Sequence, residues 1–465
     1  MISEERMRMH MSEKMEQHQN RMGVEKMLPL VISMSLPTIF SMLVQALYNV
    51  VDSFFVSRIN ESALTAVSLA FPMQNLLIAI GVGTGIGINS LIARRLGEKR
   101  YEEANQAAAH GILLGVFNYL IFLVLGLFFA GTFVKSFTDN PKVASWSIQY
   151  LQIVCICSFG FCLEINLEKV IGATGNMLYP MFFQLSGAVT NIILDPVFIF
   201  TLHMDVAGAA IATVIGQCVS LAVAVCVMHF HKDSIDVHIS MSKFHFSWQI
   251  IKDIYQVGLP SIIMNAVGSV MTSGINAILM TFQNIGETAV AFFGVYFKLQ
   301  SFVFMPVFGL NQGIIPIMGY NFGAKDKKRL ESALRIGMII AASIMLVGMI
   351  LFMAIPNQLL SIFDASSEML KLGVPALRTI SLCFIPAAFG ILISAEFTAV
   401  GKGLYSLIVT LMRQLCVLLP AAFLLAQVTG QVSAVWFAFP IAEVVSLITS
   451  LLLHFHLKHT TLKAL

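Results

Sequence analysis

Apolar residues dominate long, almost uninterrupted stretches of this chain, and polar residues gather in short segments between them. An apolar run of about 18 residues or more predicts a helix that is long enough to cross a bilayer. We expect twelve such helices, at residues 29–57, 63–93, 105–130, 145–171, 178–202, 206–229, 256–282, 286–319, 333–356, 371–398, 404–426 and 431–456. The pattern therefore predicts an all-α, polytopic membrane protein.

The composition is more apolar than that of a soluble domain. Hydrophobic residues make up 57% of the 465 residues and charged residues 11%, whereas soluble domains have about 45–50% and about 25%. A net charge of +3 gives no reason to expect a nucleic-acid partner. The seven cysteines, an odd number, lie in apolar segments, so we expect no disulfide framework.

The connecting segments predict the orientation in the membrane. Residues 1–28 are polar and lack the apolar core and cleavage site of a signal peptide, so we expect a cytosolic tail. Lys and Arg are concentrated at 94–100, 232–252 and 325–329, which places these segments on the cytoplasmic side. An even number of spans then predicts a multi-pass protein of the cell membrane with both termini in the cytoplasm.

The second half of the chain repeats the first. Glycines recur at an offset of 226 residues and a Leu-Pro pair at an offset of 223, which requires a three-residue insertion near the second helix of the second half. The pairs are Gly83 with Gly309, Gly87 with Gly313, Gly97 with Gly323, Gly111 with Gly337, and Leu36-Pro37 with Leu259-Pro260. Each repeat has an even number of helices, so we expect two lobes of the same orientation, related by a pseudo-two-fold axis along the membrane normal.

The predicted organisation is a tail at 1–28, an N-terminal six-helix lobe at 29–229, a cytosolic linker at 230–252, a C-terminal six-helix lobe at 253–456 and a cytosolic tail at 457–465. Two lobes with a cleft between them suit alternating access better than a channel, whose pore is usually lined by rings of identical groups. The other interpretation is that the repeat records gene duplication and not transport.

Two carboxylates interrupt the apolar segments of the first lobe. Asp52 lies near the end of the first predicted helix, and Tyr48 lies one turn earlier on the same face. Asp195 lies in the fifth helix, between Asn191 one turn earlier and Pro196, which cannot donate to the carbonyl of residue 192. A charge at the centre of a membrane helix costs roughly 2.5–3.5 kcal/mol on insertion scales, so it is rarely kept without a partner or a task.

These groups predict a cation site. Carboxylate, amide and carbonyl oxygens are the ligands that a hard cation such as Na⁺ prefers, and the sixth helix adds the hydroxyl of Thr213. Two close carboxylates in a low dielectric must share a proton or hold a cation. The second lobe has Ile275 and Ala421 at the equivalent positions, so we expect the coupling ion in the first lobe. The alternative is that these polar groups only hold helices together.

Other polar residues inside the apolar segments are candidates for a substrate cleft. They are Tyr48, Asn276, Lys298, Asn311, Gln312, Glu396 and Arg413. Mutual pairing and snorkelling explain most such residues without function. The glycine-rich stretch at 81–87 lacks the lysine of a nucleotide site, and we find no catalytic metal motif. We therefore expect no enzyme activity and no organic cofactor, and transport that an ion gradient drives.

Three groups of residues carry a family resemblance over about 30–455. They are Pro37 with Tyr48-Asn-Val-Val-Asp52, then Asn191-Ile-Ile-Leu-Asp195-Pro196, and in the second half Pro306, Gly309, Gln312, Gly313, Pro316 and Gly319-Tyr-Asn-Phe-Gly323-Ala324. With these the chain resembles the multidrug and toxic compound extrusion (MATE) family, in particular its MepA-like branch.

The resemblance implies a secondary antiporter that expels small lipophilic organic cations in exchange for Na⁺ or H⁺. It places the coupling cation at Asp52, Asn191, Asp195 and Thr213, with Tyr48 beside it. We expect the chain to act as a monomer. The alternative is a flippase of the same superfamily for a lipid-linked or amphipathic metabolite, which we would expect to have a cationic cleft.

Overall fold

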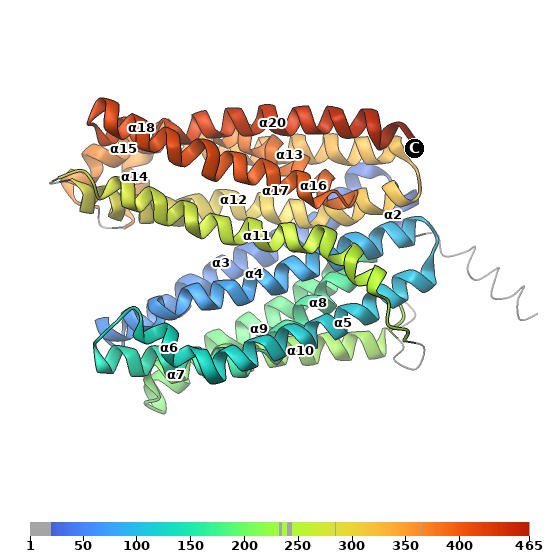
Figure 1. The fold of residues 1–465 in the computed structure, drawn as a ribbon, viewed down its shortest axis with the longest axis horizontal. Coiled ribbons are helices and arrows are strands. Elements are labelled where there is room, and N and C mark those ends of the chain that lie inside the picture. The colour runs from blue at the N-terminus through green and yellow to red at the C-terminus, as the bar shows by residue number, and fades with distance from the viewer. Residues whose placement is uncertain (1–19, 232–234, 240–243, 284, 364, 465) are drawn as a thin grey trace, which may run out of the picture.

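The computed structural model describes residues 20–231, 235–239, 244–283, 285–363 and 365–464, and all regular structure within these ranges is helical (Figure 1). In this part of the chain, ten helices are long and apolar enough to cross a membrane, or up to twelve if each of two bent helix pairs forms one span. The structure thus confirms the all-α architecture that the apolar runs predict.

The helices of the first lobe follow the short helix α2 (Arg21–Val24). They are α3 (Met27–Ser57), α4 (Glu61–Gly97), α5 (Tyr101–Val124), η1 (Leu125–Phe129), α6 (Ala130–Lys135), α7 (Pro141–Ile156), α8 (Phe159–Ala173), α9 (Leu178–Pro196), η2 (Val197–Thr201) and α10 (Asp205–Phe230), where η1 and η2 are π-helical.

The helices of the second lobe are α11 (Trp248–Leu279), α12 (Gly286–Gly323), α13 (Lys327–Ala354), α14 (Pro356–Ser361), α15 (Ser367–Ser381), α16 (Phe384–Ala399), α17 (Gly403–Leu411), the π-helical η5 (Met412–Leu418), α18 (Leu419–Thr429), α19 (Val432–Val435), α20 (Ala438–Thr460) and the 3₁₀ turn η6 (Leu462–Ala464).

Several helices continue past the apolar runs that predict them. Helix α4 begins two residues earlier than expected because the side chain of Asn60 caps it, accepting a hydrogen bond of 2.9 Å from the N–H of Ala63. It also continues to Gly97, with two arginines in its last turn, where cations favour the helix dipole. Helix α11 begins at Trp248, inside the expected linker, and α20 ends at Thr460. Hydropathy detects only the part of a helix that lies in hydrocarbon, so it does not predict the polar, capped ends of these helices.

The fourth and tenth expected spans are broken helices. The pair α7–α8 bends by 47°, and the pair α15–α16 bends by 47° as well. The breaks fall at Cys157 and Cys383, which are separated by the same offset of 226 residues as the repeated glycines. The bend is therefore part of the repeated unit.

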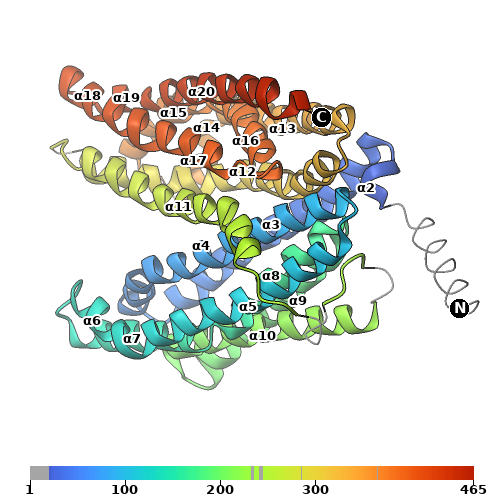
Figure 2. The same ribbon diagram turned by 45° about the vertical axis from the view of Figure 1, so that its right-hand side comes forward.

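The two lobes converge at one end of the molecule and diverge at the other. Figure 2 shows them close together near α2 and the C-terminus, and further apart toward α6, α7 and α18. Glycines make the close approach possible. A Cβ atom at Gly97 would lie 1.9 Å from the carbonyl oxygen of Tyr320, and one at Gly323 would lie 2.1 Å from that of Arg94.

These contacts are symmetric. Tyr320 follows Arg94 by the same 226 residues that separate the two glycines. The pattern recurs further along the same helices, since Gly83 meets Ile262 and Gly309 meets Ile39. The three-residue insertion lies in the turn before α12, because residues 280–285 connect α11 to α12 whereas only 58–60 connect α3 to α4. The pseudo-two-fold axis therefore passes between α4 and α12.

The segment that contains α2 also joins the lobes at the converging end. Asn20 Nδ2 donates to the carbonyl oxygen of Thr174 in the first lobe, at 2.8 Å. The carbonyl oxygen of Met22 accepts hydrogen bonds from Asn321 Nδ2, at 3.1 Å, and from Arg329 Nη2, at 2.9 Å, both in the second lobe. Residues that we expected to be part of a cytosolic tail thus form a bridge between the lobes.

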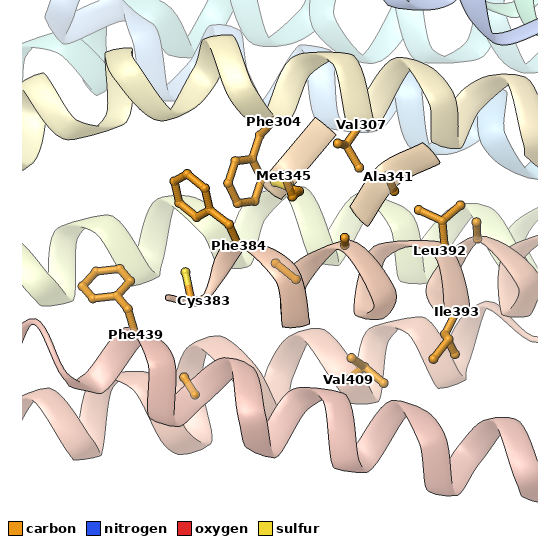
Figure 3. Close-up of a cluster of buried hydrophobic side chains, with 14 of the residues drawn as sticks. Phe304, Val307, Ala341, Met345, Cys383, Phe384, Leu392, Ile393, Val409 and Phe439 are labelled. Atoms are coloured by element: carbon orange, nitrogen blue, oxygen red, sulfur yellow. The ribbon is translucent and has the colours of Figure 1, made fainter. Parts of the chain in front are cut away.

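The second lobe has a large apolar core, part of which is drawn in Figure 3. The rings of Phe304 and Phe384 meet edge to face with centroids 5.3 Å apart, and Phe384 meets Phe352 at 5.2 Å. Helices in a membrane associate largely through such close packing, since the lipid tails are as apolar as the side chains. Beside this core, Phe304, Cys383 and Phe439 also line the cavity described below.

Candidate functional site

Two helices of the first lobe come together through a pair of glycines. A Cβ atom at Gly216 of α10 would lie 2.7 Å from the carbonyl oxygen of Gly187 of α9. One turn further along α9, Asn191 Nδ2 donates to Thr213 Oγ1 of α10 at 3.3 Å and contacts Asp195 Oδ1 at 3.5 Å. The close approach of α9 and α10 therefore places three of the expected cation ligands side by side.

Helix α3 supplies the fourth ligand. The carboxyl groups of Asp52 and Asp195 lie close enough to interact with each other. Two carboxylates that lie close together in a low dielectric repel each other unless a proton or a cation lies between them. Tyr48, one turn before Asp52, lies near Thr213 and interacts electrostatically with Asp52 and Asp195. The structure therefore brings together Asp52, Asn191, Asp195, Thr213 and Tyr48, as the sequence predicts.

Three oxygen atoms in this cluster are buried without a donor from the described residues. They are Asp52 Oδ1, Asn191 Oδ1 and Asp195 Oδ2. Asp195 is completely buried, and Asn191 and Thr213 are only 2% and 6% exposed. A buried acceptor without a donor carries the desolvation cost of that group, so such atoms are rare in folded proteins. A cation or a proton among these oxygens removes the cost.

Two further polar residues near this cluster, Tyr150 and its partner Gln74, were not expected from the sequence. Tyr150 of α7 is buried and lies close enough to Asp52 and Asp195 for an electrostatic interaction. Its hydroxyl donates to Gln74 Oε1 of α4 at 3.4 Å. A tyrosine and a glutamine in separate apolar helices give no signal in one sequence, because only the packing of α4 and α7 brings them together.

The second lobe contains a cavity of about 420 Å³. Its wall comes mainly from α11, α12, η5 and α20, and it includes Arg413, which was expected in a cleft. Arg413 Nη1 donates to Glu443 Oε1 at 3.1 Å. The cavity is large enough for a drug-sized molecule.

The other cleft candidates lie elsewhere. Lys298 is exposed, and its ammonium group lies 5.8 Å from the centre of the Phe363 ring. Gln312 accepts a hydrogen bond from Lys169 Nζ, so it joins the two lobes. Glu396 is completely buried and pairs with His454 at 2.6 Å.

Two asparagines of the second lobe are partly buried outside the cavity. Asn276 of α11 and Asn311 of α12 each have a side-chain oxygen that is buried without a partner among the described residues. Their roles stay predictions. Arg413 is therefore the one member of the second-lobe set that lines the 420 Å³ cavity within the described part of the chain.

A family model described as MatE matches residues 37–197 and 260–424, one match in each lobe and more than half of the chain in total. The chain belongs to the MatE family. This MatE chain is similar to the multidrug export protein MepA of Staphylococcus haemolyticus, with 25% identity over 418 residues that cover 90% of this chain and 91% of the relative. MepA of Staphylococcus aureus strain MSSA476 is 23% identical over 395 residues, which cover 85% and 86% of the two chains.

Solved structures show the same fold. A multidrug resistance MATE family transporter of the MOP superfamily, in an outward-facing conformation, has a TM-score of 0.91 and 27% identity, with 96% of this chain and 99% of that chain covered. A MOP superfamily transporter from Pyrococcus furiosus, described as having a binding pocket of reversed polarity, has a TM-score of 0.90 and 27% identity, with 95% and 98% covered. The fold is therefore the twelve-helix, two-lobe fold of MATE transporters, and the chain is a multi-pass membrane protein.

Proposed function

We propose that this multidrug efflux transporter is an antiporter that exports organic cations in exchange for Na⁺ or H⁺. The family and the likeness to MepA proteins support the export of drugs. The observation that carries the ion-coupled part is the cluster of Asp52, Asn191 and Asp195, in which three oxygen atoms are buried without a donor from the described residues. A structural cluster would be expected to satisfy its own hydrogen bonds, whereas a site that loads and unloads a cation leaves oxygens open.

The same cluster serves either ion. Na⁺ would take oxygen ligands from Asp52, Asn191, Asp195 and Thr213, while H⁺ would be shared between the two carboxyl groups, with the amide and the hydroxyl as supports. Binding neutralises the acid pair and removes the repulsion between the carboxylates of α3 and α9. Helix α3 then shifts or bends, and this movement lowers the affinity for the drug. The ion drives transport only if it binds the two states with different affinity.

The basic residues orient the transporter. Arg94, Arg95 and Arg100 lie around the turn from α4 to α5, and Lys325 and Lys327 lie around the turn from α12 to α13, both at the converging end of the lobes. The positive-inside rule places this end, and both termini, in the cytoplasm of a cell. The structure then represents a state that is closed to the cytoplasm. One chain contains both the cation cluster and the cavity, which supports a monomer as the working unit.

The test is ethidium efflux from proteoliposomes under an imposed Na⁺ gradient and, separately, an imposed pH gradient. We expect efflux under at least one gradient, and its loss in Asp52→Asn and Asp195→Asn. Asp139→Asn is the matched control, because Asp139 is exposed in the turn between α6 and α7. Efflux at the native rate in both site variants would overturn the proposed site. A native protein that exports no ethidium under either gradient would instead favour the flippase.

A further inference from the structure

The cavity of the second lobe lies at a position related to the cation cluster by the internal repeat. Met271, which lines the cavity, is equivalent to Tyr48 at the offset of 223, and Phe439 is equivalent to Thr213 at the offset of 226. The first lobe fills this position with acids and polar groups. The second lobe leaves about 420 Å³ of space there. The repeat has thus produced an ion site in one lobe and a drug-sized cavity in the other.

The cavity contains one charge of each sign. Arg413 and Glu443 line it, joined by the single contact of 3.1 Å between Nη1 and Oε1. Their side chains are 26% and 13% exposed, and among the described residues no other acid contacts this guanidinium. The remaining donors of Arg413 and the second oxygen of Glu443 are therefore available to a molecule in the cavity.

The π-helical segment η5 supplies Arg413 to the cavity wall. Arg413, Gln414 and Leu418 all line it, and all three come from the π-helical segment η5. A π-helical turn shifts side chains relative to an α-helix and is frequent at functional sites. Gln414 also presents an oxygen that is buried without a partner from the part of the chain that the structure describes.

We infer that this cavity binds aromatic zwitterions, with the carboxylate of the ligand on Arg413 and its cationic group on Glu443. The inference rests on the proposed export of amphipathic drugs and extends it beyond simple cations. A zwitterion replaces the internal ion pair by two ion pairs and leaves the net charge of the cavity at zero. A simple cation can pair with Glu443 only by competing with Arg413, and it leaves the cavity with one uncompensated positive charge.

The rest of the wall suits an aromatic ligand. Rings of Phe297, Phe304, Phe308 and Phe439 line the cavity, and such rings provide large apolar contact at little entropic cost. Helix α4 of the first lobe completes the wall with Asn75, whose Nδ2 donates to Ser269 Oγ at 3.0 Å. A bound ligand therefore contacts both lobes, so its affinity must change when the lobes move.

The experiment compares rhodamine B, which has a carboxylate and a cationic ring system, with its ethyl ester, which keeps only the cation. Binding to the purified transporter is measured by fluorescence anisotropy without any ion gradient. We expect the native protein to prefer rhodamine B. Arg413→Gln leaves Glu443 unpaired, and we expect about tenfold weaker binding of rhodamine B with binding of the ester retained or strengthened. Glu443→Gln should do the opposite and weaken the ester most.

Arg413→Lys keeps the charge and should keep the preference for rhodamine B. Lys298→Gln is the control, because Lys298 is exposed and lies outside the cavity. Equal losses for both dyes in Arg413→Gln and Glu443→Gln would show a structural ion pair and overturn the inference. Asp52→Asn separates the two proposals. We expect it to abolish ion-driven efflux and to leave the ratio of the two dye affinities unchanged.

Discussion

The contact between Gly97 and the carbonyl oxygen of Tyr320 offers a direct test of how the lobes close. In Gly97→Ala the new Cβ atom would lie 1.9 Å from this oxygen. An ordinary contact needs about 3.5 Å, so α4 and α12 would have to separate by roughly 1.5 Å at this point. This nearest atom belongs to the backbone, which no side-chain rotation can move away. The substitution therefore destabilises the closed state relative to a state in which the lobes are separated.

The destabilisation of the closed state by Gly97→Ala follows from the cost of overpacking, which is typically about 1–3 kcal/mol. If the state with separated lobes avoids this cost, the ratio of closed to separated molecules falls by about 5–150-fold. Gly323→Ala should have the same effect, because its Cβ atom would lie 2.1 Å from the carbonyl oxygen of Arg94 in the symmetric contact. Drug efflux should fall in both variants, since each transport cycle must pass through the closed state.

The assay places spin labels at Glu102→Cys and Lys328→Cys, two exposed positions at the first turns of α5 and α13, after replacement of the seven native cysteines. Electron paramagnetic resonance then reports the distance between the labels. We expect longer distances in both glycine variants than in the parent. Gly131→Ala is the control, because no atom lies within 4 Å of its added Cβ. A distance distribution in Gly97→Ala that matches the parent would refute the reasoning.

Three further predictions test other parts of the structure. Gly216→Ala would place a Cβ atom 2.7 Å from the carbonyl oxygen of Gly187 and push α9 away from α10, so we expect ion-driven ethidium efflux to fall at least tenfold. The reference is Gly294→Ala, whose added Cβ atom meets no atom within 4 Å and lies outside the cavity. Thr213→Val removes one oxygen ligand. We expect it to raise the Na⁺ concentration for half-maximal efflux if Na⁺ is the coupling ion, and Thr213→Ser to restore the native value. Arg329→Gln removes the charged donor to the carbonyl oxygen of Met22, at 2.9 Å, so we expect faster tryptic cleavage at Arg21 than in the control Lys328→Gln. Equal cleavage in the two variants would count against the role of the α2 segment in joining the lobes.

Local sequence patterns determine much of the fold, so these features can be predicted from the sequence alone. An apolar run specifies a membrane helix without reference to its neighbours, and the helices recur in order along the chain. The repeated glycines predicted two equivalent lobes, and the symmetric contacts of Gly97 and Gly323 confirm the repeat. Asn191 and Asp195 were predicted to act together because a spacing of four residues places them on one face of a helix. Their role in binding an ion stays a prediction.

Only the tertiary structure decided which side of each helix faces a partner. Lys298 and Arg413 both interrupt apolar segments, yet Lys298 is exposed whereas Arg413 lines the cavity beside Glu443. Tyr150 interacts electrostatically with Asp52 because of the packing of helices that are distant in sequence. In hydrocarbon, lipid-facing and buried positions are equally apolar, so hydropathy carries no information on helix rotation. That information lies in the close contacts of small residues and in the pairing of charges, and both require the packed helices.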